Sequence, residues 1–220
     1  MNKVDYRLNA LVDASLADVA PLAELALAAA LNGATILQYR DKHGSTREMI
    51  DNARAIHEAI AGTGVPLVIN DRIDVALASG ADGVHLGADD MDAKTARRIL
   101  GEKAIIGLTV KNRADAERAA SMPADYGCIG GVFETVSKVN PDKPVGIDGF
   151  ATLRALLKEW RPDMPVGAIA GIDLARVPSV IEAGADGVAV ISAIFRAGDI
   201  ASATKGFRSA IDAALKARQP

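Results

Sequence analysis

The chain has 220 residues, of which 50% are hydrophobic and 24% are charged, which is typical of a globular protein whose core folds without disulfides or structural metals. Its 25 Lys and Arg residues against 28 Asp and Glu residues give a net charge of −3 with both signs interspersed, which argues against nucleic acid or an anionic membrane as the main partner. The single cysteine excludes an intrachain disulfide, and the first residues lack an apolar signal core, so we expect the chain in the cytoplasm.

Short aliphatic runs alternate with alanine-rich segments of helical period along the whole chain. The predicted strands are Arg7–Val12, Thr35–Tyr39, Leu67–Asn70, Gly83–Leu86, Ile105–Thr109, Tyr126–Ile129, Val166–Ile169 and Gly187–Ile191. The predicted helices are Leu22–Leu31, Thr46–Ile60, Asp92–Leu100, Arg113–Ala119, Phe150–Trp160, Leu174–Ala183 and Ala203–Ala217. Eight strands, each followed by a helix or a helical turn, indicate parallel crossover units. They favour one α/β domain over residues 1–220, a closed (β/α)8 TIM barrel of the phosphate-binding type rather than an open doubly wound sheet.

A short motif occurs twice, at the predicted entries to the fourth and eighth strands. Gly80–Val84 and Gly184–Val188 both read Gly-Ala-Asp-Gly-Val, and each leads from a helix end into an apolar run. Glycine at these places predicts helix ends with positive φ. Turn chemistry and a repetition of the half-barrel explain the motif equally well, and both explanations stay open.

The second predicted strand ends in three polar side chains. Because side chains alternate along a strand, Gln38, Arg40 and Lys42 point to the same side, toward the end of the barrel where active sites of this fold lie. An amide, a guanidinium and an ammonium group in a row predict a site for a dense anion such as pyrophosphate. The alternative is a solvated strand end whose charges pair with Asp41 or Glu48.

Two carboxylates follow the neighbouring strands. Asp71 comes after the third predicted strand and Asp90 after the fourth, so both lie at the same rim as the cationic side chains. Together they could hold one Mg²⁺, which accepts one or two carboxylates and binds phosphate oxygens. Each aspartate alone could instead cap the helix that follows it. Since both face the cationic side chains across one mouth, we favour the magnesium site.

A second set of phosphate-binding elements is predicted at the same mouth. The fifth strand places the Thr109 hydroxyl at the rim, and the long segment Gly130–Gly149 has the length of a functional loop. The loops after strands seven and eight, which carry Gly171 and Ser192, form the usual phosphate site of this architecture. Two anion sites in one mouth predict two phosphorylated substrates.

Six segments resemble the thiamine-phosphate synthase family in order and spacing, over nearly the whole chain. They are Gln38–Lys42, Val68–Arg72, Gly83–Asp90, Gly107–Thr109, Thr135–Lys138 and Gly184–Ser192. The resemblance implies an enzyme that joins 4-amino-2-methyl-5-hydroxymethylpyrimidine diphosphate to thiazole phosphate, with Mg²⁺ as cofactor. The products would be thiamine phosphate and pyrophosphate.

The resemblance also implies roles for individual residues. Those that would bind the pyrimidine diphosphate are Gln38, Arg40, Lys42, Asn70, Thr109 and Lys138. Those that would bind thiazole phosphate are Thr135, Ser137, Gly171, Ile191 and Ser192, and those that would bind Mg²⁺ are Asp71 and Asp90. Arg40, Thr109 and Lys138 would act catalytically by stabilising the departing pyrophosphate. The thiazole nitrogen would then capture the pyrimidine-methyl cation that is left.

Five positions depart from the usual pattern of this family. Ala88 stands where glutamine is common, Lys111 where histidine is frequent, and Thr109 where serine is usual. Glu134 takes the place of a proline, and Ala170 replaces the first of two glycines. The methyl group at residue 170 could crowd the approach of phosphate to the backbone, so the departures concern the thiazole side more than the diphosphate side.

Three other functions are compatible with the fold. The related thiazole tautomerase branch uses a histidine near the end of strand five, and this chain has none after His85. A phosphosugar isomerase or lyase would need His85 or an unmetallated Asp71 as its base, whereas we interpret His85 and Cys128 as interior residues of the barrel. A non-catalytic thiamine-precursor binding protein would bind the diphosphate without turnover. In each case the partners are small molecules, and the alanine-rich helix faces permit a homodimer without requiring one.

Overall fold

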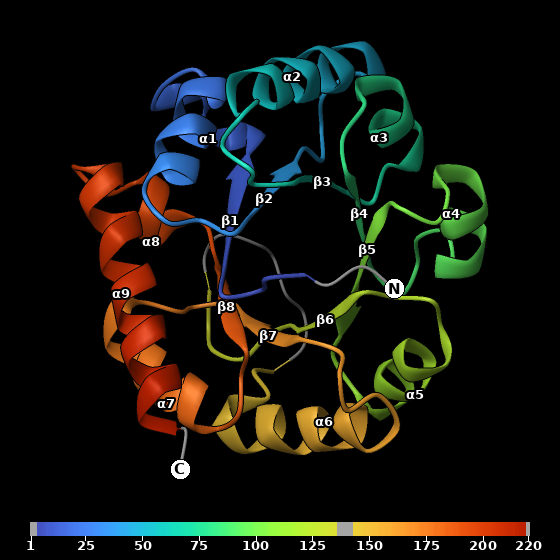
Figure 1. Ribbon diagram of the computed structural model, residues 1–220, viewed down its shortest axis with the longest axis vertical. Coiled ribbons are helices and arrows are strands. Elements are labelled where there is room, and N and C mark those ends of the chain that lie inside the picture. Colours follow the sequence, from blue (N-terminus) through green and yellow to red (C-terminus); the bar gives the residue numbers. More distant parts are fainter. Residues whose placement is uncertain (1–3, 136–142, 219–220) are drawn as a thin grey trace.

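Eight parallel strands close into a barrel in the computed structural model, which describes residues 4–135 and 143–218 (Figure 1). The strands are β1 (Leu8–Asp13), β2 (Ile36–Arg40), β3 (Leu67–Asn70), β4 (Gly83–Leu86), β5 (Ile105–Val110), β6 (Tyr126–Ile129), β7 (Val166–Ile169) and β8 (Gly187–Val190). Each strand pairs with its neighbours in sequence, and β8 pairs with β1. The predicted (β/α)8 barrel is confirmed.

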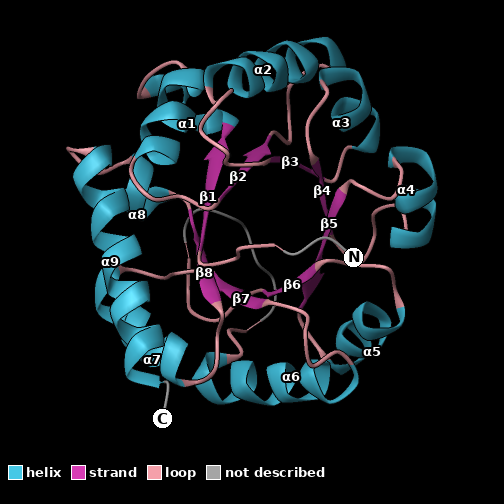
Figure 2. Cartoon of the chain, viewed as in Figure 1, coloured by secondary structure: helices cyan, strands magenta, loops and turns pink. Residues whose placement is uncertain are grey.

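The helices form a ring around the strands (Figure 2). They are α1 (Leu22–Leu31), α2 (Thr46–Ala59), α3 (Ile73–Ser79), α4 (Ala93–Leu100), α5 (Arg113–Ser121), α6 (Gly146–Trp160), α7 (Val177–Glu182), α8 (Ser192–Phe195) and α9 (Ile200–Arg218), with two 3-10 helices, η1 (Ala14–Asp18) and η2 (Leu174–Arg176). Across the described ranges, none of these helices combines the length and the apolar character that a membrane span requires.

The strand predictions agree with the structure to within one residue at each end, whereas several helix predictions differ for local reasons. The prediction lacks α3, whose seven residues make too few turns for a clear helical period. The predicted helix Leu174–Ala183 is divided into η2 and α7, and Pro178, which lacks an amide hydrogen, lies in the first turn of α7. The last helix starts earlier than predicted, where Asp199 accepts a hydrogen bond from the Ser202 amide at 3.0 Å.

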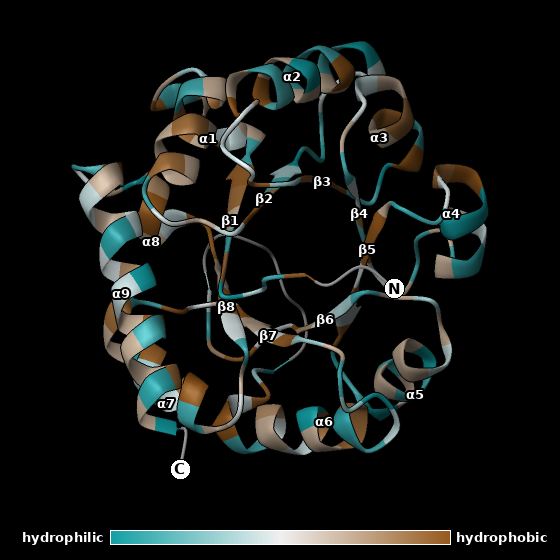
Figure 3. Cartoon of the chain, viewed as in Figure 1, coloured by the Kyte–Doolittle hydropathy of each residue, from teal (hydrophilic) through white to brown (hydrophobic). Residues whose placement is uncertain are grey.

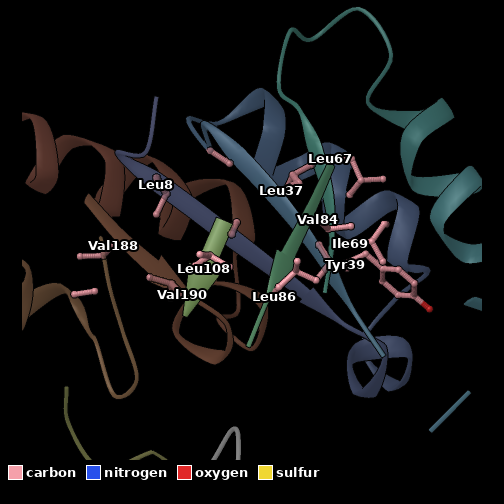
Figure 4. Close-up of a cluster of buried hydrophobic side chains, with 14 of the residues drawn as sticks. Leu8, Leu37, Tyr39, Leu67, Ile69, Val84, Leu86, Leu108, Val188 and Val190 are labelled. Carbon is pink, nitrogen blue, oxygen red and sulfur yellow. The ribbon is translucent and has the colours of Figure 1, made fainter. Parts of the chain in front are cut away.

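The hydrophobic residues form two layers. Side chains that point outward from the strands, such as Leu37 and Tyr39 of β2 and Val188 of β8, pack beneath the helices (Figure 4). Side chains that point inward fill the barrel and include Tyr6, Leu11, Ile36, Val68, Tyr126 and Cys128. The helices carry both hydrophobic and hydrophilic residues, as expected when one helix face packs on the barrel and the other meets water (Figure 3).

The residue just before each even-numbered strand clamps that strand to the start of the preceding one. These four residues are Thr35, Asp82, Asp125 and Asp186, and their amides donate to carbonyls of the preceding strand at 2.7–2.8 Å. Their side-chain oxygens accept hydrogen bonds from amides at the start of that preceding, odd-numbered strand at 2.8–2.9 Å. The repeated Gly-Ala-Asp-Gly-Val motif contains two of the four clamps, so turn chemistry explains it better than a repetition of the half-barrel. Gly80 and Gly184 have the positive φ that was predicted.

Tyr6 closes the barrel at the N-terminal ends of the strands. Its side chain is buried, and its ring lies 4.8 Å from the ring of Tyr126, measured between centroids. Gly167 of β7 leaves room for this ring, because an added Cβ would lie 1.7 Å from Tyr6 Cε1. The barrel interior is thus filled from this end.

The clamp at Asp125 also carries the most deeply buried ion pair among the described residues. Arg97 Nη2 lies 2.7 Å from Asp125 Oδ2, and the two side chains are 9% and 0% exposed. Arg97 also donates to the carbonyls of Ala104 and Pro123, so this one guanidinium ties α4 to the starts of β5 and β6.

We predict that Asp125→Ala lowers the free energy of unfolding by roughly 3–5 kcal/mol, because it leaves the Arg97 guanidinium buried without a counter-charge. Asp186→Ala is the matched control, since it removes the same kind of clamp at a carboxylate whose side chain is 28% exposed. It should cost only about 1 kcal/mol. Urea unfolding followed by circular dichroism measures both losses, and equal losses would contradict the role given to the buried pair.

Candidate active site

A cavity of about 520 Å³ opens at the C-terminal ends of the strands. The predicted site residues that line it are Gln38, Arg40, Lys42, Asn70, Asp71, Asp90, Thr109, Thr135, Gly171, Ile191 and Ser192. Ser137 and Lys138 were also predicted and lie outside the described residues. Candidates from seven different strands and the loops that follow them therefore meet in one cavity.

The cationic side of the cavity is built on β2. Arg40 forms an ion pair with Asp13, its direct neighbour in the register between β1 and β2, and the two side chains are 15% and 10% exposed. Lys42 forms an ion pair with Asp71, and its side chain is 39% exposed. Both cations thus face the cavity with one carboxylate partner each, which an incoming anion could replace.

The alternative pairing partners proposed from the sequence have other roles. The Asp41 carboxylate accepts hydrogen bonds from the Tyr39 hydroxyl at 3.1 Å and from the Gly44 amide at 2.8 Å. Glu48 forms the capping box of α2 with Ser45. The alternative that the charges of Arg40 and Lys42 pair with Asp41 or Glu48 is wrong, because these carboxylates are held by contacts with Tyr39 and with the loop before α2.

Asp71 adopts a backbone conformation that is unusual for a residue with a side chain. Its φ is 64°, in the left-handed region, and its amide donates to the His85 carbonyl at 2.8 Å. The Asn70 amide group and the Lys42 ammonium group both donate to the Asp71 carboxylate. Since a positive φ costs energy outside glycine, the surrounding contacts hold this carboxylate in a specific orientation at the rim.

Asp90 lies against Asp71 across the same rim. The Gly87 amide donates to Asp90 Oδ2 at 2.6 Å. Burial raises the pKa of the Asp90 carboxyl, and the adjacent Asp71 carboxylate raises it further, while the Gly87 amide and the Lys42 ammonium oppose the shift. Two carboxylates that destabilise each other in this way form a site that a cation would stabilise.

Neither carboxylate caps a helix, so the second interpretation offered from the sequence does not hold. The residue before α3 is Arg72, which makes no side-chain cap, and the cap of α4 is Asp92, which accepts from two amides. Asp71 and Asp90 are therefore left to face the cavity. As an oxygen-donor pair beside an anion-binding side, they fit Mg²⁺, which binds through one or two carboxylates and keeps several waters.

The opposite side of the cavity is formed by the loops after β6, β7 and β8. The Val132 amide donates to the Ile169 carbonyl at 3.1 Å, and the Phe133 amide donates to the Ala170 carbonyl at 3.2 Å, so the loop after β6 runs along the end of β7. Gly171 has a φ of 63°, and an added Cβ would lie 2.2 Å from the Glu134 carbonyl oxygen. Only glycine allows this close approach, which places Gly171 next to Thr135.

Ala170, one of the departures from the family pattern, has a φ of 90°. Glycine adopts this conformation without cost, whereas an alanine there is strained. The positive φ at residue 170 thus explains why glycine is usual there. The space for phosphate that the sequence analysis suggested is a second reason.

The floor of the cavity contains a chain of polar side chains. His85 Nε2 lies 2.9 Å from Thr109 Oγ1, and His85 Nδ1 lies 3.1 Å from the Tyr126 hydroxyl. His85 and Cys128 are both buried, at 7% and 3% exposure, as expected for interior residues of the barrel.

Sequence reasoning missed two carboxylates of this region. Asp13 pairs with Arg40, and the alternation of inward residues along β1 would have revealed it had the predicted strand not ended at Val12. Asp115 lines the cavity from the first turn of α5 and accepts a hydrogen bond from the Lys111 amide at 3.0 Å. Its helical position gave no signal in the sequence, because acidic residues are common in first turns.

Comparison with known proteins agrees with this geometry. A family model described as thiamine monophosphate synthase matches residues 8–194. A thiamine-phosphate synthase of Agrobacterium fabrum is 93% identical over 100% of both chains, and one of Chloroflexus aurantiacus is 41% identical over 94% of both chains. The solved structure of a thiamine phosphate pyrophosphorylase from Pyrococcus furiosus has a TM-score of 0.83 at 32% identity, covering 97% of this chain and 98% of that one. The chain belongs to the thiamine monophosphate synthase family.

Proposed function

We propose that this chain is a thiamine-phosphate synthase, which condenses the pyrimidine diphosphate with thiazole phosphate and releases pyrophosphate. The observation that carries the proposal is one cavity with cationic and acidic side chains on one side and backbone loops on the other, each of which would bind one anion. Membership of the family and the 93% identity to the Agrobacterium enzyme support it. We further propose that residues 1–220 form one domain that acts on small molecules in the cytoplasm, as a monomer or homodimer.

The pyrimidine diphosphate would bind on the β2 and β3 side. Arg40 presents a planar guanidinium that matches two phosphate oxygens, and Lys42 adds a mobile ammonium group. Asn70 lies beside Asp71, to which its side-chain amide donates, and the same amide can donate to the anion. Gln38 is buried two residues deeper along β2, where it would meet the pyrimidine ring.

Asp71 and Asp90 are the proposed ligands of Mg²⁺. Within the described ranges, no group of three or more His, Cys, Asp or Glu side chains forms a fuller cage, and a carboxylate pair suffices for an ion that keeps its waters and binds phosphate oxygens. When bound, Mg²⁺ would supply positive charge to the pyrophosphate leaving group. Lys42 would then exchange its contact with Asp71 for one with the substrate.

The side chains act by stabilising a leaving group and by positioning. Arg40, Thr109 and Lys138 would donate hydrogen bonds to the pyrophosphate oxygens that gain charge as the bond to the pyrimidine methylene group breaks. The pyrimidine-methyl cation would be captured by the thiazole nitrogen, held within reach by its phosphate. This route needs no nucleophile from the protein.

Thiazole phosphate would bind at the loops after β6, β7 and β8. The residues proposed for it are Thr135, Ser137, Gly171, Ile191 and Ser192. The contact between Gly171 and the loop after β6 supports this assignment, because it places the Thr135 hydroxyl and the Gly171 backbone on the same wall of the cavity. The strained Ala170 would narrow this side relative to relatives with glycine.

We expect purified protein, mixed with both substrates, to form thiamine phosphate with Mg²⁺ and to form none with a chelator present. The reason is that the positive side chains alone neutralise the pyrophosphate leaving group only in part, and the metal supplies the remaining positive charge. Chromatographic detection of the product measures this directly. Diphosphate binding without product would favour the precursor-binding alternative, and a lack of binding would favour a phosphosugar enzyme.

We predict that Asp71→Asn lowers kcat/KM at least ~100-fold, because the neutral amide is a weaker ligand of Mg²⁺. Asp74→Asn is the matched control, as this aspartate lies three residues further on, is 59% exposed and pairs with Arg72 outside the cavity. It should retain nearly full activity. Comparable activity of both variants would remove Asp71 from the metal site.

Arg40→Ala should lower kcat/KM by at least ~100-fold, since it removes the bidentate donor to the leaving group. The exposed Arg47 of α2 provides the control variant Arg47→Ala, whose activity should match that of the unmodified protein. Circular dichroism checks that each variant is folded. If Arg40→Ala folds and turns over normally, the diphosphate does not bind along β2.

A further inference from the structure

The polar chain in the cavity floor has a defined direction. The Tyr126 side chain is fully buried, and among the described residues its hydroxyl has His85 Nδ1 as hydrogen-bond partner, at 3.1 Å. Burial raises the pKa of the Tyr126 phenol well above its ordinary value, so this hydroxyl keeps its hydrogen. A buried hydroxyl donates wherever an acceptor is in reach, and here the acceptor is Nδ1.

The direction of the bond between Tyr126 and His85 determines the direction of the bond between His85 and Thr109, and with it the direction in which the Thr109 hydroxyl donates. If Nδ1 accepts from Tyr126, the imidazole hydrogen sits on Nε2, which then donates to Thr109 Oγ1 at 2.9 Å. The opposite tautomer would turn an N–H toward the Tyr126 hydroxyl and leave the hydroxyl hydrogen without this acceptor. Thr109 Oγ1 thus accepts from below, and its own hydrogen is directed to the cavity that the residue lines.

We infer that Tyr126 and His85 hold the Thr109 hydroxyl as a hydrogen-bond donor to the anion in the cavity, so that His85 is a positioning residue for the leaving pyrophosphate. The identity of the anion rests on the proposed function. His85 moves no proton in this role, because its imidazole only keeps a hydrogen on Nε2 throughout. His85 thus has a function in addition to filling the interior of the barrel.

The shape of the neighbouring strand supports this arrangement. Gly107 and Thr109 lie on the same face of β5, and an added Cβ at Gly107 would lie 2.0 Å from Cζ of Tyr126. Because Gly107 has no side chain, the phenol of Tyr126 has the space to lie beneath the imidazole of His85. The two rings stack with centroids 5.5 Å apart and planes 18° apart, which keeps both polar groups in line.

Binding of inorganic pyrophosphate with Mg²⁺, measured by titration calorimetry, tests the inference without turnover. Thr109→Val removes the hydroxyl and keeps the shape, and we expect it to weaken binding roughly tenfold, the loss of one hydrogen bond to a charged group. His85→Leu should weaken binding by a similar factor, and the double variant should bind no more weakly than Thr109→Val. His85→Gln, whose amide nitrogen can replace Nε2 as donor, should recover most of the affinity, and His57→Gln is the control on α2.

The inference would be overturned if the double variant lost affinity for pyrophosphate by the product of the two single losses. Equal affinities of His85→Gln and His85→Leu would also overturn it. If His85→Leu does not fold, ¹⁵N NMR of the unmodified protein still decides, with the His85 signals assigned from their loss in His85→Gln. Nε2–H with unprotonated Nδ1 is the expected tautomer, and Nδ1–H would overturn the inference. Protein that shows the predicted binding pattern but forms no thiamine phosphate would refute the proposed function alone.

Discussion

The register of the barrel, set at the N-terminal ends of its strands, decides which side chains meet at the other end. A slip of one residue in β2 would exchange the inward pair Gln38 and Arg40 for the outward pair Leu37 and Tyr39. The clamps at Thr35, Asp82, Asp125 and Asp186 join strands in pairs and oppose such slips. They lie away from the cavity, so they fix its geometry without occupying it, in keeping with the separation of stability and chemistry in this fold.

The charged side chains of the cavity are arranged so that a bound metal and anion can replace contacts that they make with one another. Arg40 and Lys42 each have one carboxylate partner, whereas Asp90 faces another carboxylate and has a raised pKa as a result of burial and that neighbour. A divalent cation held by Asp71 and Asp90 would relieve the repulsion between these carboxylates, and a diphosphate would bind Arg40 and the Lys42 ammonium group that Asp71 releases. The ion pair between Lys42 and Asp71 would be replaced in this way, and each of its two charges would gain a new partner.

Most of the fold and the composition of the site were predictable, because both depend on local rules. Period-two alternation located β2 and its inward polar residues, and the position of active sites at strand ends gathered Asp71, Asp90 and Thr109. The positive φ of Asp71 and Ala170 was not predictable, because it is imposed by contacts between loops. The direction of the bonds from Tyr126 to Thr109 depends on distances across three strands, and no pattern in a single sequence reports them.

The most direct test of the two-sided cavity is a crystal structure of the protein with Mn²⁺, which reports the Mg²⁺ position by anomalous scattering, and inorganic pyrophosphate. We predict an anomalous peak about 2.1 Å from carboxylate oxygens of Asp71 and Asp90, with pyrophosphate against Arg40 and Lys42. Pyrophosphate bound at the loops around Gly171 and Ser192, with no metal between the two aspartates, would contradict the assignment of the diphosphate side.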